Sequence, residues 1–353
     1  RNMLSQPRSR KRWIALISFS ALLCLSFLLC LLLGSSKIGM GESFLALFGV
    51  GKESSIRIVQ KIRLPEALAA LIAGAGLSVS GLIMQTVLGN IMASPSTLGV
   101  SNAAVFGANV SIILASGGYL SLDKNADGFF SSGNPFATSL VAFAFAFLSV
   151  LLVLALCRIR SFNPSSVILA GVALGSVWTA GTTVLQFYAT DVGLSAAVVW
   201  SFGDLGRASF LSDLIMAIVV LVAVIFFFLL RYRYNALLSG DVFARSVGVK
   251  VGVLRFASLL LASLVTAVCV SYLGVIGFVG IVCPHIMRKL LGDNHSFLIP
   301  GSLLCGSSLL LLSSVFAKAI APGNSLPIGA VTSLLGAPFF LYLVFFSRGK
   351  SSC

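Results

Sequence analysis

Charged residues are scarce in this sequence. Only 10% of its 353 residues are charged and 58% are hydrophobic, whereas soluble globular domains carry about 25% charged residues. This composition excludes an ordinary soluble protein. An outer-membrane barrel is also excluded, because its strands would alternate apolar and polar residues, whereas stretches such as 13–33 and 210–230 are continuously apolar. We therefore expect an all-α integral membrane protein whose surroundings are the lipid bilayer.

The residues of a catalytic or metal site are also missing. The sequence has two histidines and seven cysteines, with no CxxC pair, so it predicts neither a metal site nor a disulfide framework. It has no phosphate-binding loop, because Gly51 and Lys52 are followed by Glu53 in place of Ser or Thr. We expect no enzyme activity and no cofactor bound by this chain. Any nucleotide hydrolysis would belong to another polypeptide.

Apolar runs long enough to cross a bilayer are frequent. A spanning helix needs roughly 20 apolar residues. Eight candidates are clear: 13–33, 67–88, 98–116, 136–157, 167–188, 210–230, 297–320 and 326–346. The stretch 256–291 is too long for one crossing and short for two. Its three glycines, Gly274, Gly277 and Gly280, would form a smooth stripe on one helix face, which is typical of close helix packing.

The distribution of charge favours two crossings in that stretch. Basic clusters lie at 1–12, 158–160, 231–255, 288–289 and 348–350, and they hold sixteen of the 24 basic residues, while the loops that carry them contain only two of the ten acidic ones, Asp241 and Asp293. Basic residues concentrate in cytoplasmic loops, so all five clusters are expected on one side of the membrane. This predicts ten transmembrane helices in a single domain, 1–353, with both termini cytoplasmic. Clusters separated by apolar runs also argue against a nucleic-acid partner.

Three local features could carry function. The first is a basic group, Arg57, Lys61 and Arg63, which falls on the outer side of the membrane, opposite the basic clusters. It is either an ordinary solvated loop or a docking patch for an acidic partner. The second is the segment 88–99, whose spacing favours a tight hairpin. The third is the loop 231–255. A short helix there would start at Ser239, Gly240 or Asp241 and stop at Gly248.

That short helix would expose Val242, Phe243 and Val247 to a partner and leave Arg245 in water. It could equally lie at the lipid interface. A carrier driven by an ion gradient usually places ionisable side chains inside the membrane, and no span contains an unambiguous one. An ion-coupled carrier or channel is therefore the weaker alternative.

A series of short motifs points to a family. They are IRLP at 62–65, GAGL at 74–77, LGVS at 98–101, LAGVALG at 169–175, the loop 240–248, GFVGIVCPH at 277–285, LPIG at 326–329 and GAPF at 336–339. In this order they resemble the permease family of ABC importers for iron chelates, haem and vitamin B12, the type II importers. The resemblance implies ten spans in two inverted five-helix repeats. A weak echo of such a repeat is visible between SVSGLI at 78–83 and SYLGVI at 271–276.

The resemblance also implies the partners. They are a second copy of the chain, two ATP-binding cassette subunits that carry ATP and Mg, and an external substrate-binding protein, all assembled at the cytoplasmic membrane of a prokaryote. The binding protein would dock on Arg63, Glu66 and Lys318, with Arg57 and Lys61 as further candidates. Glu66 departs from the family, which often has Arg there. The expected cargo is an iron(III)-siderophore, with haem and cobalamin as alternatives.

Two more sites follow from the resemblance. The cytoplasmic gate is expected at Asn90 and Met92 after the second span and at Pro164 and Ser165 before the fifth. Ile91 and Pro164 depart from the family pattern, so the place of the gate is better supported than its chemistry. The coupling segment is expected within 231–255, and its recurrent positions are Gly240, Asp241, Ala244, Arg245 and Gly248.

Overall fold

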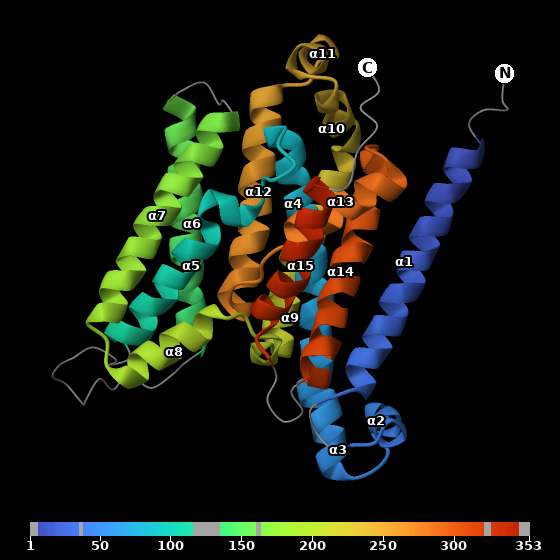
Figure 1. Cartoon of the computed structure of the whole chain (residues 1–353), viewed down its shortest axis with the longest axis vertical. Coiled ribbons are helices and arrows are strands. Elements are labelled where there is room, and N and C mark those ends of the chain that lie inside the picture. Colours follow the sequence, from blue (N-terminus) through green and yellow to red (C-terminus); the bar gives the residue numbers. More distant parts are fainter. Residues whose placement is uncertain (1–5, 35–37, 116–134, 160–163, 321–325, 346–353) are drawn as a thin grey trace.

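The computed structural model describes residues 6–34, 38–115, 135–159, 164–320 and 326–345, and all regular elements within these ranges are helical (Figure 1). The α-helices are α1 Gln6–Leu32, α2 Met40–Leu47, α3 Glu53–Ile58, α4 Leu64–Leu88, α5 Val100–Asn109, α6 Pro135–Ile159, α7 Pro164–Phe187, α8 Asp191–Ser201, α9 Phe210–Leu229, α10 Arg231–Leu238, α11 Asp241–Ser246, α12 Val251–Leu273, α13 Val279–Leu291, α14 His295–Ile320 and α15 Ile328–Phe345. Two π-helical turns, η1 Val59–Arg63 and η3 Val110–Ala115, and two 3₁₀ turns, η2 Pro95–Leu98 and η4 Leu205–Arg207, complete them. Of the predicted basic N-terminal stretch, residues 1–5 lie outside the described part.

Ten helices stand where the sequence predicted ten spans, but they are not equally long. Within the described ranges, seven of them, α1, α4, α6, α7, α9, α12 and α14, are long and apolar enough to cross a membrane. The predicted spans 98–116 and 326–346 correspond to the shorter helices α5 and α15, and the second crossing in 256–291 is α13, of 13 residues. At 1.5 Å per residue, α13 is only about 20 Å long. The ten-span expectation is therefore confirmed for seven helices.

The helix α4 forms the centre of the bundle. It packs against α14, α12, α13 and α9, and nearly all of its residues from Ala67 onward are buried. Small residues allow these close contacts: a Cβ added to Gly74 or Gly81 would collide with the backbone of Gly306 or Gly280, respectively. On the other side of α12, the helices α5, α6 and α7 form a second group (Figure 1).

The glycine stripe predicted for 274–280 is not formed. α12 ends at Leu273, Gly274 has φ +78°, and the chain leaves the helix until α13 begins at Val279. Of the three glycines, Gly280 alone lies in a helix, and it packs closely against α4. The backbone of the break is paired elsewhere, since the amide of Asp204 donates to the carbonyl oxygen of Leu273 at 2.7 Å. Such irregular backbone is tolerated at membrane depth when protein surrounds it.

The same break falls within one of the two segments that echo each other in sequence. Residues 78–83 lie inside α4, whereas 271–276 cover the end of α12 and the start of the break. Their local structures differ because Gly274 adopts a positive φ that ends the helix. The echo therefore does not mark two equivalent pieces of helix.

The two ends of the bundle are clearly different (Figure 1). At one end α1 begins, α15 ends, and the short helices α10 and α11 project. At the opposite end lie α2 and α3. This arrangement places the loop 231–255 and the basic group at 57–63 on opposite ends of the molecule, as the charge pattern predicted.

Candidate functional site

The loop 231–255 contains the predicted short helix. α11 covers Asp241–Ser246 and follows α10 after Ser239 and Gly240. Gly240 has φ +98° and Gly248 has φ +85°, backbone values that residues with a Cβ rarely adopt. The two glycines therefore mark the ends of α11 because the backbone there has a positive φ. The amide of Val249 also donates to the carbonyl oxygen of Ala244 at 2.9 Å, which closes the helix end.

α11 turns an apolar surface away from the bundle. Val242 is 84% exposed, and Phe243 and Val247 are 50% and 55% exposed. Ala244 is fully buried and Arg245 is exposed. This is the orientation that the sequence predicted. Exposed apolar side chains grouped on one projecting helix are typical of a protein interaction site.

Asp241 has a partner that the sequence analysis did not identify. Its two carboxylate oxygens accept hydrogen bonds from Nη1 and Nη2 of Arg255, at 2.7 and 2.8 Å. The side chain of Arg255 is only 12% exposed. A planar guanidinium that meets a carboxylate through two bonds fixes geometry as well as charge. Because the two residues lie fourteen positions apart and in different helices, no local spacing signals this pair.

α10 provides a fixed base for α11. The hydroxyl of Tyr234 lies 2.8 Å from the hydroxyl of Ser258 on α12, and the Tyr234 side chain is fully buried. Burial raises the pKa of Tyr234, so its hydroxyl stays neutral at ordinary pH. α11 therefore projects from a helix that is itself anchored in the bundle.

The predicted gate residues after α4 lie in an ordered turn. Gly89 ends α4 in the left-handed conformation, and the side-chain oxygen of Asn90 accepts a hydrogen bond from the amide of Met92 at 2.9 Å. The segment then forms η2, so it is more structured than the tight hairpin that its spacing favoured. Met92 is 53% exposed. Its accessibility is compatible with a gate, and the gating role stays a prediction.

The other pair of predicted gate residues begins α7. Pro164 is the first residue of this helix, where the missing amide hydrogen costs nothing and the fixed φ suits the helix. This gives a structural reason for a proline at this position. Ser165 follows it on the surface of the first turn. Their gating role likewise stays a prediction.

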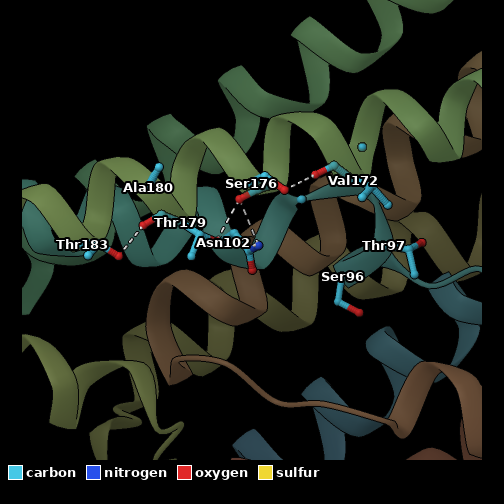
Figure 2. A pocket seen from close by; sticks show the side chains of 11 residues that line it. Ser96, Thr97, Asn102, Val172, Ser176, Thr179, Ala180 and Thr183 are labelled. Atoms are coloured by element: carbon cyan, nitrogen blue, oxygen red, sulfur yellow. Dashed lines mark hydrogen bonds between the residues drawn. The ribbon is translucent and has the colours of Figure 1, made fainter.

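A groove of about 510 Å³ runs between η2, α5 and α7 (Figure 2). Its wall consists of small and polar residues and carries no charged side chain: Ser96, Thr97, Gly99, Asn102, Gly171, Val172, Gly175, Ser176, Thr179, Ala180 and Thr183. α7 and η2 lie so close together that a Cβ at Gly171 would be 2.6 Å from the Cα of Leu98. The glycines of the LGVS and LAGVALG motifs therefore meet here.

The polar side chains of the groove are held in place by neighbouring acceptors. Asn102 donates to the carbonyl oxygen of Gly175 and to the hydroxyl of Thr179, both at 3.2 Å. The hydroxyls of Ser176, Thr179 and Thr183 donate to carbonyl oxygens one turn earlier in α7. The lone pairs of Ser176 and Thr183 are then available to the groove, whereas the hydroxyl of Thr179 already accepts one bond, from Asn102. The sequence analysis did not find this site, although the spacing 176, 179 and 183 places these hydroxyls on one helix face.

The predicted docking residues fall into two groups. Arg63, Glu66 and Lys318 are inside the bundle. Arg63 is 3% exposed and donates to the carbonyl oxygens of Leu31 and Leu32 at the end of α1. Lys318 Nζ lies 2.9 Å from Glu66 Oε2, with side-chain exposures of 6% and 12%.

These three side chains therefore hold α1, α4 and α14 together at the end of the bundle that carries α2 and α3. Glu66 is also bonded to the hydroxyl of Ser314 at 3.0 Å. In this conformation the three do not form an exposed docking surface. The physical reason is that packing removes these charges from water, so each needs a partner inside the protein. Arg63 finds it in the carbonyl groups at the C-terminus of α1, and Lys318 finds it in Glu66.

Arg57 and Lys61 form the second group and are exposed. Arg57 makes an ion pair with Glu53 one turn earlier in the same helix, and such surface pairs contribute little stability. The available basic surface at this end is therefore smaller than the sequence predicted. Its role in docking stays a prediction.

The comparisons with known proteins fit these features. Residues 22–346 match the FecCD transport family. The chain belongs to this family. An ABC transporter permease protein of Methanocaldococcus jannaschii is 42% identical over 95% of both chains. A Helicobacter pylori permease named for an iron chelatin transport system is 37% identical over 83% of both chains.

Family members named for other cargoes match as well. A hemin transport permease of Yersinia pestis and a vitamin B12 import permease of Escherichia coli are 32% and 34% identical to this chain. A solved structure of a metal-chelate type ABC transporter, in an inward-facing conformation, covers 94% of this chain and 98% of its own, with 28% identity and a TM-score of 0.79. The chain is thus a multi-pass permease of an ABC importer and is not itself the ATPase.

Proposed function

We propose that this chain is the transmembrane subunit of an ATP-driven importer that moves an iron(III)-siderophore across the cytoplasmic membrane of a prokaryote. The groove between η2, α5 and α7 carries this proposal. Its wall offers hydroxyl and amide groups without charge, so it can hydrogen-bond a bulky polar chelate without holding it tightly. A transport path requires binding that is weak enough to permit release.

A second copy of the chain would complete the path. The groove is open on one side, and the outward face of α7 carries exposed apolar residues such as Leu169, Val177 and Val184. Two such faces would bury these residues against each other and enclose a common passage. The ATPase subunits would bind α11 on the cytoplasmic side. The external binding protein would dock near Arg57 and Lys61.

Haem and cobalamin remain the competing cargoes, because relatives carry their names. Haem is a flat and largely apolar molecule, and a wall of hydroxyls suits it less well than aromatic side chains would. The groove wall contains no aromatic residue. The hydroxyl-lined wall therefore favours the more polar siderophore.

Uptake into proteoliposomes tests the proposal. The permease is reconstituted with its ATPase and binding protein, with ATP inside the vesicles. Uptake of ⁵⁵Fe-labelled hydroxamate and catecholate chelates is compared with uptake of haem and of cobalamin. We expect ATP-dependent uptake of an iron chelate and none with an ATPase variant that cannot hydrolyse ATP. Preferred uptake of haem or cobalamin would overturn the choice of cargo.

The same vesicles distinguish an ATP-driven importer from an ion-coupled carrier. Asp213 in the first turn of α9 is 3% exposed, and its carboxylate has no hydrogen-bond partner among the described residues. Buried ionisable groups of this kind serve ion coupling in carriers. We expect uptake to persist when ionophores collapse the proton and sodium gradients. Uptake that stops with the gradients and continues without ATP would overturn the ABC mechanism.

A further inference from the structure

One guanidinium group joins three elements at the cytoplasmic end. Arg255 lies in the second turn of α12 and binds Asp241 at the start of α11 through Nη1 and Nη2. Its third donor, Nε, bonds the carbonyl oxygen of Val87 in α4 at 2.8 Å. The same rigid plane therefore contacts the projecting helix α11 and the central helix α4.

The contact with Val87 satisfies a group that needs an external donor. Val87 lies in the last turn of α4, where the final four carbonyl groups of a helix have no intrahelical partner. The positive charge of Arg255 also faces the negative end of the helix dipole. A lysine could provide the charge but not three donors in one plane.

The position of Val87 connects this contact with the predicted gate. Only Leu88 and Gly89 separate it from Asn90, and Gly89 turns the chain out of the helix. On the other side, Asp241 is the first residue of the helix that exposes Val242 and Phe243. Bonds of 2.7 to 2.8 Å through Arg255 thus connect the start of α11 directly with the end of α4.

A second link reaches the neighbouring residue of α4. The side-chain oxygen of Asn235 on α10 lies 2.8 Å from Nδ1 of His295, and Nε2 of His295 lies 2.9 Å from the hydroxyl of Thr86. Thr86 precedes Val87 directly. The last turn of α4 is therefore connected to α10 at Thr86, through His295, and to α11 at Val87, through Arg255.

We propose that Arg255 is a positioning residue that transmits the movement of α11 to the end of α4 and to the gate segment 89–94. This inference rests on the proposed function, because it requires an ATPase that moves α11. Arg255 does not touch cargo or nucleotide in this scheme. Its function is to keep α11 and the end of α4 in one mechanical unit.

The experiment uses the assembled permease and ATPase in lipid nanodiscs. A spin label is placed at Ile91, which is 50% exposed in the gate segment, in a parent lacking the exposed Cys24 and the C-terminal Cys353. Spectra are compared without nucleotide and with ATP plus vanadate. The variants are Arg255→Lys, Asp241→Asn and the control Arg233→Lys, which changes an exposed arginine of α10.

We expect the nucleotide-dependent change at the label to fall roughly tenfold in Arg255→Lys, while the ATPase still binds and hydrolyses ATP; thermal stability falls as well, because a lysine cannot keep all three bonds of this largely buried group. Asp241→Asn weakens one of the two contacts and gives an intermediate loss; it carries the test if Arg255→Lys fails to fold. The control retains the full change.

Three results would overturn these ideas, and they are distinguishable. A full label response in Arg255→Lys and Asp241→Asn, in complexes that hydrolyse ATP, would overturn the role of Arg255 and leave the proposed function intact. A parent chain that binds no ATPase would overturn the proposed function itself, whereas a parent label that does not respond in a complex that hydrolyses ATP would overturn the movement of the gate segment and with it the role of Arg255.

Discussion

The two ends of the bundle contrast in how they use charged and apolar side chains. At one end, α11 exposes Val242 and Phe243 to water. At the other, the charged residues Glu66 and Lys318 are buried and paired. Both arrangements reverse the usual preference of these residue types. The difference shows two ways of placing these residue types: on a helix that projects from the bundle, apolar side chains offer a surface for another molecule, whereas the buried charges satisfy each other within the chain.

The largest effect is expected from breaking the buried pair. Lys318→Met leaves the Glu66 carboxylate without its counter-ion in the bundle. We expect a loss of about 3–5 kcal/mol in stability, measured by thermal unfolding in detergent. The double variant with Glu66→Gln should recover most of the loss. If Lys318→Met unfolds at the parent temperature, the pair does not hold α4 and α14 together.

The matching change at the other end is Phe243→Asp. It should leave the unfolding temperature unchanged, because the side chain is half exposed and packs little in the isolated chain. It should weaken ATPase binding by about 2–4 kcal/mol if Phe243 is an anchor of the interface. Co-purification and titration of the ATPase measure this, with the exposed Ser246→Ala as control. Normal ATPase binding by Phe243→Asp would contradict the assignment of α11.

A smaller effect is expected from Gly240→Ala. At φ +98° and ψ 161° an alanine is strained by about 1–3 kcal/mol, and nothing lies within 4 Å of the added Cβ. The start of α11 should therefore shift without a clash, and ATPase affinity should fall by less than in Phe243→Asp. Gly252→Ala, also in open space but with no positive φ, should behave like the parent.

The smallest effect concerns the exposed basic residues at the end with α2 and α3. Lys61→Glu should slow association of the binding protein a few-fold at low ionic strength and less at high salt, because rim charges act mainly on encounter. Stopped-flow binding at two salt concentrations measures this. The stability of the chain should not change. An association rate that is insensitive to both the substitution and salt would remove Lys61 from the docking surface.

Several parts of the site could be predicted because their causes are local. Gly240 and Gly248 bound α11, and Val242, Phe243, Val247 and Arg245 are exposed as their positions in the sequence predicted. Likewise, continuous apolar runs gave the positions of the long helices within a few residues. These features need only backbone conformation and helix periodicity.

Other parts could not be predicted because they join distant residues. The groove needs α7 to pack on η2 and α5, and the glycines at 274 and 277 do not form the expected stripe because both lie in the break between α12 and α13. Arg63 was expected in water, but the end of α1 lies over it and offers carbonyl oxygens. Sequence position does not reveal such neighbours.

The amino-acid sequence by itself determined that this chain is a membrane bundle, which end of each helix carries the basic loops, and where α11 starts and stops. Composition, charge and local backbone preference suffice for these properties. Only the tertiary structure decided which charges are solvated, where a groove opens and how α11 is connected to α4. These depend on side chains that meet across the bundle, and whether a charge such as Lys318 is stable there depends on the partner that packing brings to it.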